Sequence, residues 1–311
     1  MKNTALSQRV KIRKTSYLYL APALVTILIF TILPIIYSIY IAFTNYSLNT
    51  MDNYKFVGLQ NFIDILTGSF SKIFFPVFGW NIFFALISTV GTFFVGLILA
   101  LVLSNKFMKE SFIYKAILII PWALPATIAI ISWQGLFNTD NGAINLFLMK
   151  LHLIKDPIMW LSEKWVARIA IIIVNIWLGF PYMMNVCMGA ISSIPETYYE
   201  AAEIDGASKW VQFIKITLPS LALTAYPLLI SSFAFNFNNF GAAFLITGGG
   251  PANPATQYAG YTDILASATY KLTINFYQYG VGAALSIIIF LLIGTISFVQ
   301  MRASGQFKGE D

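Results

Sequence analysis

The chain has 311 residues, of which 58% are hydrophobic and only 10% are charged, and its mean hydropathy is +0.74. Soluble domains carry roughly 25% charged residues, so the composition excludes a soluble globular protein and indicates an integral membrane protein. Membrane orientation accounts for the net charge of +6, which requires no nucleic-acid partner. The single cysteine, Cys187, excludes a disulfide within the chain.

Six apolar segments are long enough to cross a bilayer, which takes about 20 mainly apolar residues. They predict an all-α integral membrane protein with six transmembrane helices, at residues 17–43, 78–104, 112–137, 166–190, 218–247 and 281–301. An even number of crossings places both termini on one side of the membrane. The basic residues before the first segment mark that side as cytoplasmic.

This layout divides the chain into successive segments. The apolar run that follows the basic N-terminus is longer than the core of a signal peptide, so we interpret it as a retained first helix. The predicted segments are a basic cytoplasmic N-terminus (1–16), the first transmembrane helix (17–43), a short extracytoplasmic segment (44–77), a five-helix core (78–302) and a cytoplasmic tail (303–311).

The interiors of the predicted helices contain no Asp, Glu, Lys, Arg or His. Proton-coupled carriers usually need such residues inside the membrane, whereas sodium coupling through backbone carbonyls stays open. The sequence also lacks the Gly-x-x-x-x-Gly-Lys-Ser/Thr phosphate loop of a nucleotide-driven motor. The single histidine, His152, falls in an outer loop without visible partners, so no catalytic residues, metal site or cofactor is predicted in this chain.

The cytoplasmic segment 195–219 has the pattern of a polar helix–turn–helix. Pro195 and Glu196 favour the start of a helix, and Gly206 can end it in the left-handed conformation. Ser208 can cap a second helix, and Pro219 suits the first turn of the next membrane helix. Such an element is either a docking surface for another protein or a plain cytoplasmic loop, and the residues alone favour neither.

Two membrane helices carry polar and aromatic stripes with helical spacing. At i, i+3, i+4 and i+7, one stripe holds Asn175, Leu178, Gly179 and Tyr182, and the other holds Ser232, Phe235, Asn236 and Asn239. In the third predicted helix, Pro121 and Pro125 loosen the backbone around Trp122 and Ala126. Amides and aromatic rings without formal charge suit a neutral, hydroxyl-rich solute. The alternative is that the polar residues only join helices.

The cytoplasmic segment resembles a known family motif. Glu200-Ala201-Ala202, a gap of three residues, Gly206, and then Ile216-x-Leu218-Pro219 match the EAA loop of binding-protein-dependent ABC importer permeases. In that family the loop is a coupling helix that sits in a cleft of the ATPase subunit. The resemblance therefore implies that Glu200, Ala201, Ala202 and Gly206 are ATPase-coupling residues.

Further strings, across about residues 75–302, resemble maltose/maltodextrin permease subunits of the MalF type. These are 175–184 (NIWLGFPYMM), 232–240 (SFAFNFNNF), 259–263 (AGYTD), 135–138 (GLFN) and 248–251 (GGGP). The resemblance implies the type I ABC importer permease (MetI-like) fold. It also implies a substrate-binding set of Trp122, Asn175, Leu178, Gly179, Tyr182, Ser232, Phe235, Asn236 and Asn239. The family pattern has Tyr and Ser where this chain has Trp122 and Ala126, so a ring that can stack on a sugar is kept at the first position and a hydroxyl contact is lost at the second.

The resemblance also implies an assembly in a bacterial cell membrane. Its parts are a second related permease in a heterodimer, two ATPase subunits that bind ATP and Mg, and an extracytoplasmic sugar-binding protein. The expected function is import of maltose or maltodextrin by a non-catalytic membrane subunit. Alternatives are a permease for another neutral di- or oligosaccharide and an ATP-independent carrier or channel for a polar solute. An intramembrane enzyme has the least support, because no acid, base or metal cluster lies at depth.

Overall fold

A computed structural model describes residues 17–105 and 108–303 of the chain. Its regular structure is helical, apart from an isolated bridge between Thr44 and Phe56, which confirms the all-α prediction for this part of the chain. The helices are α2 (Leu33–Ala42), α3 (Gln60–Leu66), α4 (Ser71–Leu103), α5 (Ser111–Leu118), α6 (Ile120–Ala123), α7 (Ala126–Leu136), α8 (Ala143–Lys150), α9 (Lys164–Ser192), α10 (Glu196–Ile204), α11 (Lys209–Gln212), α12 (Leu218–Phe237), α13 (Phe240–Thr247), α14 (Leu265–Tyr270) and α15 (Tyr279–Ala303).

Five helical stretches of the described chain are long and apolar enough to cross a membrane. They are Tyr17–Ala42, Ser71–Leu103, Lys164–Ser192, Lys209–Thr247 and Tyr279–Arg302, and they overlap five of the six predicted segments. The helix predicted to begin at residue 78 begins at Ser71, inside the predicted segment 44–77. The earlier start buries Phe74 and Val77 in the core.

The third predicted helix, at 112–137, is not continuous. It is divided into α5, α6 and α7, and the backbone is extended at Leu124 and leaves helical geometry at Pro125. A proline disfavours helical geometry at the residue before it, which explains the break. The loosening expected from the prolines is therefore a complete interruption of the helix.

The fifth predicted helix is also divided. α12 begins with Pro219 in its first turn, as predicted, and ends at Phe237, and α13 begins at Phe240. The side chain of Asn239 accepts a hydrogen bond from the backbone N–H of Ala242 at 3.4 Å, so it caps the second piece. One helical face therefore extends from Ser232 only as far as Asn236.

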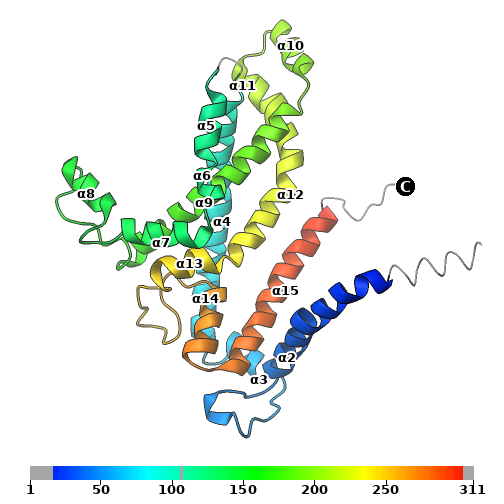
Figure 1. Cartoon of the computed structure of the whole chain (residues 1–311), viewed down its shortest axis with the longest axis vertical. Coiled ribbons are helices and arrows are strands. Elements are labelled where there is room, and N and C mark those ends of the chain that lie inside the picture. The colour runs from blue at the N-terminus through cyan, green and yellow to red at the C-terminus, as the bar shows by residue number, and fades with distance from the viewer. Residues whose placement is uncertain (1–16, 106–107, 304–311) are drawn as a thin grey trace, which may run out of the picture.

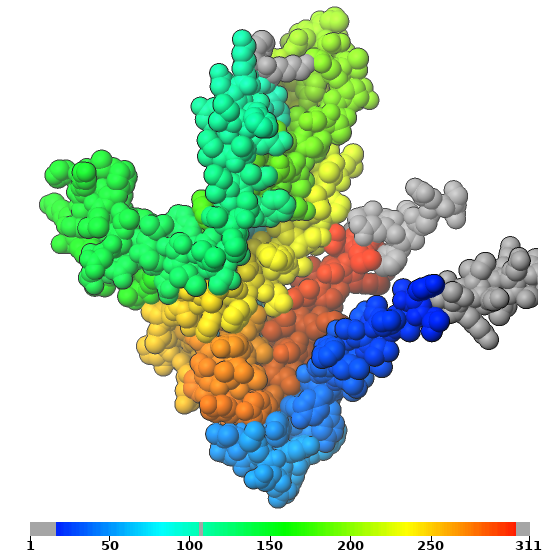
Figure 2. Space-filling view, viewed as in Figure 1, coloured from blue at the N-terminus to red at the C-terminus, as the bar shows by residue number. Residues whose placement is uncertain are grey.

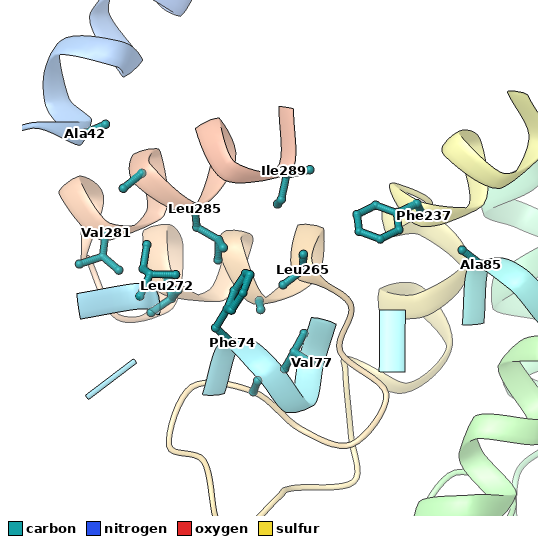
Figure 3. Close-up of a cluster of buried hydrophobic side chains, with 14 residues drawn as sticks. Ala42, Phe74, Val77, Ala85, Phe237, Leu265, Leu272, Val281, Leu285 and Ile289 are labelled. Atoms are coloured by element: carbon teal, nitrogen blue, oxygen red, sulfur yellow. The ribbon is translucent and has the colours of Figure 1, made fainter. Parts of the chain in front are cut away.

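Three groups of buried side chains hold the helices together, and the largest joins elements from across the whole sequence. Figure 3 shows Phe74 and Val77 from α4 facing Leu265 from α14 and Leu285 from α15, and Phe237 at the end of α12 lies to the right, near Ala85. Ala42, at the end of α2, belongs to the same cluster. It fixes the first and last membrane helices against the α4 side of the bundle.

Figure 1 shows that α10 and α11 lie at one end of the molecule, whereas α3 and the chain around it lie at the opposite end. That segments 195–219 and 44–77 are on opposite sides of the membrane stays a prediction. The α7–α8 segment projects to one side, away from the first and last membrane helices (Figure 2). The two interrupted helices meet between these regions, where α13 packs against α7 and α9.

Candidate functional site: a cavity at two helix breaks

A cavity of about 560 Å³ lies where the breaks in the two interrupted helices face α9. All nine residues that the sequence predicts as substrate-binding line it: Trp122, Asn175, Leu178, Gly179, Tyr182, Ser232, Phe235, Asn236 and Asn239. Ala126 lines it too. Residues from three separate stretches of sequence, 122–126, 175–182 and 232–239, therefore meet in one place. That they contact a solute stays a prediction.

The cavity also has polar lining residues that the sequence patterns did not predict. Thr92 comes from α4, Thr127 from the first turn of α7 and Ser231 from α12. Thr127 follows Ala126 directly and could have been found from the Pro125 break, because a helix that starts inside the membrane exposes its first turn. Ser231 directly precedes Ser232 of the predicted stripe, and Thr92 follows Ser88 and Thr89 by four and three residues, so neighbouring hydroxyls were the available signal for both.

Three asparagines form a network across the helices. Nδ2 of Asn175 donates to Oδ1 of Asn236 at 2.8 Å, and Nδ2 of Asn239 donates to Oδ1 of Asn175 at 2.8 Å. Nδ2 of Asn236 donates to Oγ1 of Thr89 at 3.1 Å and to Oγ of Ser232 at 3.3 Å. Asn175 and Asn236 are only 4% and 5% exposed. The network thus satisfies amides that would be costly to bury alone and joins α9 to both pieces of the interrupted helix.

Aromatic rings supply much of the accessible wall. Trp122 and Tyr182 lie with their ring centroids 6.2 Å apart at an interplanar angle of 43°, and Phe235 is 70% exposed. Exposed ring faces are suited to packing against the C–H faces of a sugar ring. The rings therefore offer a stacking surface, while the buried amides hold the helices that carry it.

Gly179 has a packing role at the edge of the cavity. A Cβ atom at this position would lie 2.6 Å from Cγ2 of Thr92 on α4. This distance is too short for a side chain without a shift of one helix, so glycine permits the close approach of α4 and α9. The sequence predicts Gly179 only as part of the cavity lining, and the missing side chain serves the helix contact as well.

The cavity lining contains no Asp, Glu, Lys, Arg or His. Over the described residues, no group of three or more His, Cys, Asp or Glu side chains is placed to hold a metal ion. Recognition here can use rings, hydroxyls and amides, but no opposite charge for a carboxylate or phosphate.

The predicted helix–turn–helix is present as α10 and α11. Gly206 has φ +76°, and α10 ends with two backbone bonds, from Gly206 to Glu203 at 3.0 Å and from Ala207 to Ala202 at 2.8 Å. This pair of bonds is the Schellman arrangement that a left-handed glycine completes. The side chain of Ser208 caps α11, accepting from the N–H of Val211 at 3.4 Å. α11 ends at Gln212, and a π-helical turn at Phe213–Thr217 leads from it into α12.

The surface of α10 is open. Glu200, Ala201 and Gly206 are exposed, Ala202 is half-buried, and Ile204 is 87% exposed. A hydrogen bond of 2.8 Å between the hydroxyls of Tyr199 and Thr217 ties the helix back to the membrane portion. The ion pair with Lys209 lowers the pKa of Glu203, first through a hydrogen bond and then through charge attraction.

At the other end, the segment between α13 and α14 encloses a buried carboxylate. Oδ2 of Asp263 pairs with Nζ of Lys271 at 2.6 Å and accepts from the N–H of Gly260 at 2.7 Å. Oδ1 of Asp263 accepts from the hydroxyl of Ser267 at 2.7 Å. Gly249 approaches so closely that a Cβ would collide with the carboxylate. Asp263 therefore has a structural role that the sequence alone does not indicate.

Comparison with known proteins gives one consistent family. Residues 15–307 match the model of the binding-protein-dependent transport system inner membrane component. The chain is 42% identical over 253 residues to the maltose/maltodextrin transport system permease protein MalF of Salmonella typhimurium, a match that covers 80% of this chain and 49% of that protein. It is 38% identical over 298 residues to the galactooligosaccharides transport system permease protein GanP of Bacillus subtilis, covering 94% and 71%.

The chain spans about half the length of the MalF relatives it matches. The fold matches a chain of a bacterial ABC transporter involved in the import of the acidic polysaccharide alginate, with a TM-score of 0.79 over 97% of this chain and 98% of that one, at 22% identity. These findings confirm the MetI-like permease fold and a non-catalytic, integral membrane component. The chain belongs to the family of binding-protein-dependent transport system inner membrane components.

Proposed function

We propose that the chain is the permease subunit of an ATP-driven ABC importer and that it translocates a neutral oligosaccharide, with maltose and maltodextrins as the first candidates. The observation that carries the proposal is the convergence of nine residues on one uncharged cavity at two helix breaks. Interrupted helices that line a cavity are a common way to build a substrate pathway in transporters. The similarity to MalF and GanP supports a sugar as the solute.

The chemistry of the cavity favours a neutral substrate over an acidic one. Its rings and hydroxyls suit a pyranose, and it has no cation to pair with a carboxylate. The alginate importer is similar in fold at 22% identity, so its acidic cargo is no guide to this chain. Because the chain is also similar to GanP, other neutral oligosaccharides, including galactose-containing ones, are the main alternative substrates to maltodextrin.

The exposed α10 carries the proposed coupling to ATP. Glu200, Ala201, Ala202 and Gly206 would contact an ATPase subunit, and closure of two such subunits would move the helices that flank the cavity. A second related permease and an extracytoplasmic sugar-binding protein complete the assembly, with both termini of this chain in the cytoplasm. A bacterial alginate ABC transporter of similar fold has been solved in complex with a pentasaccharide-bound periplasmic protein, which supports delivery by such a protein.

The test is uptake of labelled maltose and maltodextrins by proteoliposomes containing the purified complex. Uptake should require the sugar-binding protein and internal ATP, and unlabelled neutral oligosaccharides should compete while acidic ones should not. Uptake that runs on an ion gradient without ATP would instead favour a secondary carrier. Transport that continues with a phosphate-loop-dead ATPase partner would refute ATP coupling.

The coupling residue is tested separately with Glu200→Lys. This charge reversal on the exposed face of α10 should abolish co-purification of the ATPase and reduce uptake to background. Asp156→Lys, an equal charge reversal in the exposed segment between α8 and α9, is the matched control and should leave both intact. If Glu200→Lys keeps ATPase association and uptake, the docking assignment is wrong.

A further inference from the structure

Most polar side chains of the cavity are already engaged with other groups of the protein. The three asparagines hydrogen bond to one another and to neighbouring hydroxyls. Ser231 donates to the carbonyl of Pro227 at 3.1 Å, and Thr92 donates to that of Thr89 at 2.9 Å. A sugar that hydrogen bonded to these donors would first have to break their existing hydrogen bonds, and this cost offsets much of the binding free energy gained.

Thr127 differs from these residues. It lines the cavity, its residue is exposed, and its hydroxyl makes no hydrogen bond within the described part of the chain. It lies two residues after Pro125, in the first turn of α7, and directly after Ala126, which has no polar group. The free hydroxyl therefore belongs to the short segment that the helix break places in the cavity wall.

The aromatic rings of the same cavity indicate which group this hydroxyl can bind. Trp122 precedes it on α6, its ring centroid lies 6.2 Å from that of Tyr182, and both rings belong to the cavity lining. A pyranose that packs its C–H face on these rings turns its hydroxyl groups outward around the rim of the ring. A protein hydroxyl in the same cavity lining, such as that of Thr127, can both donate to and accept from such a group.

We propose that Thr127 is a specificity-determining residue of the cavity and that it recognises a single hydroxyl of the bound oligosaccharide. This inference rests on the proposed transport of a neutral sugar. The rings select the sugar class by shape, and Thr127 selects among sugars by the position of one oxygen. A site that hydrogen bonds a substrate hydroxyl discriminates against the analogue that lacks it.

The test uses Thr127→Val, which keeps the shape of the side chain and removes the hydroxyl. The exposed position makes a large loss of stability unexpected, and thermal unfolding checks this. KM for ATP-dependent uptake is measured for maltose and for a set of singly deoxygenated maltose analogues. The variant should raise KM for maltose about three- to tenfold, as expected for one lost hydrogen bond. For the analogue that lacks the hydroxyl recognised by Thr127, wild type and variant should have the same KM.

Two controls give the result its meaning. Thr127→Ser should retain the wild-type preference, because it keeps the hydroxyl. Ser132 is on the same helix but outside the cavity lining, and its hydroxyl donates to the carbonyl of Ile128 at 2.9 Å. Ser132→Ala should therefore leave every KM unchanged. Equal KM values for Thr127→Val and wild type across every sugar would overturn the assignment and leave the transport function standing. A wild-type complex that takes up no neutral sugar would overturn both.

Discussion

Asn175 and Asn236 are 61 residues apart in the sequence, and their buried amides meet at 2.8 Å between α9 and α12. Asn239 donates to the same Asn175 from the start of α13. Asn175 is thus the centre of a polar contact that joins three helices beside the cavity. The position of Asn239 comes from the helix break and not from the continuous helical stripe inferred from the sequence.

Replacement of Asn175 by Leu should destabilise the protein in detergent. The change removes the donor to Oδ1 of the buried Asn236 and the acceptor for Nδ2 of the half-buried Asn239, and a buried polar atom left without a partner costs about 1–3 kcal/mol of unfolding free energy. Combined replacement of Asn175 and Asn236 by Leu should cost less than the sum of the two single changes. Thermal unfolding measures both effects. Additive losses would show that the two amides are energetically independent.

Gly179→Ala should separate α4 from α9 and destabilise the protein by about 1–3 kcal/mol, because its Cβ would overlap Cγ2 of Thr92. Thr92→Ser removes that methyl group and should restore much of the loss in the double variant. Gly189→Ala, on the same helix with no atom within 4 Å of the added carbon, is the neutral control. Detergent unfolding that gives equal losses at both glycines would contradict the packing role of Gly179.

Asp263→Asn should weaken the segment between α13 and α14. The change leaves Lys271 without its buried partner, and breaking such a pair costs about 3–5 kcal/mol. The exposed pair of Lys209 with Glu203 offers a comparison. Lys209→Met removes a cation that is mostly exposed, so the loss of unfolding free energy should be small. Thermal unfolding of the two variants side by side tests the contrast. Similar small losses would show that the buried pair is not a major contributor.

The pH dependence of the α10–α11 segment should follow Glu203. Its pKa is lowered by Lys209, so the pair stabilises the loop at neutral pH, and this stabilisation is lost as the pH falls through the folded-state pKa of Glu203. Lys209→Met should return that pKa toward its usual range and move the transition to higher pH. The fluorescence of Trp210, which adjoins Lys209, can follow the titration. An unchanged midpoint in the variant would rule out Lys209 as the cause.

The sequence was informative where patterning and local chemistry decide the structure. Apolar length located the membrane segments, and the αL glycine and the capping serine placed the turn between α10 and α11. The stripes in α9 and α12 identified cavity residues because helical spacing places them on one face. Proline identified a weak point in the third segment.

Other features depend on contacts between distant segments and could not be read from local patterns. The break before α13 lies in a run of residues that otherwise favours a continuous helix. The only sequence signal for it is the ability of Asn239 to cap a helix. The mutual bonding of the asparagines depends on how α9 meets α12. Thr127 lines the cavity only because of the helix break at Pro125, so its position could not be read from a continuous helical pattern. Asp263 is explained by Lys271 and Gly249, which approach it from different turns of the chain.

The contact between α4 and α9 limits which parts of the molecule can change shape. At Gly96 and Gly179 the two helices approach so closely that an added carbon would meet the opposite helix, so neither can slide along the other without steric overlap. Rearrangement is easier at the non-helical joints at Leu124–Pro125 and Asn238–Asn239. The wall of the cavity formed by α4 and α9 is therefore held by direct backbone contact, whereas α7 and α13 each follow a non-helical joint in the chain.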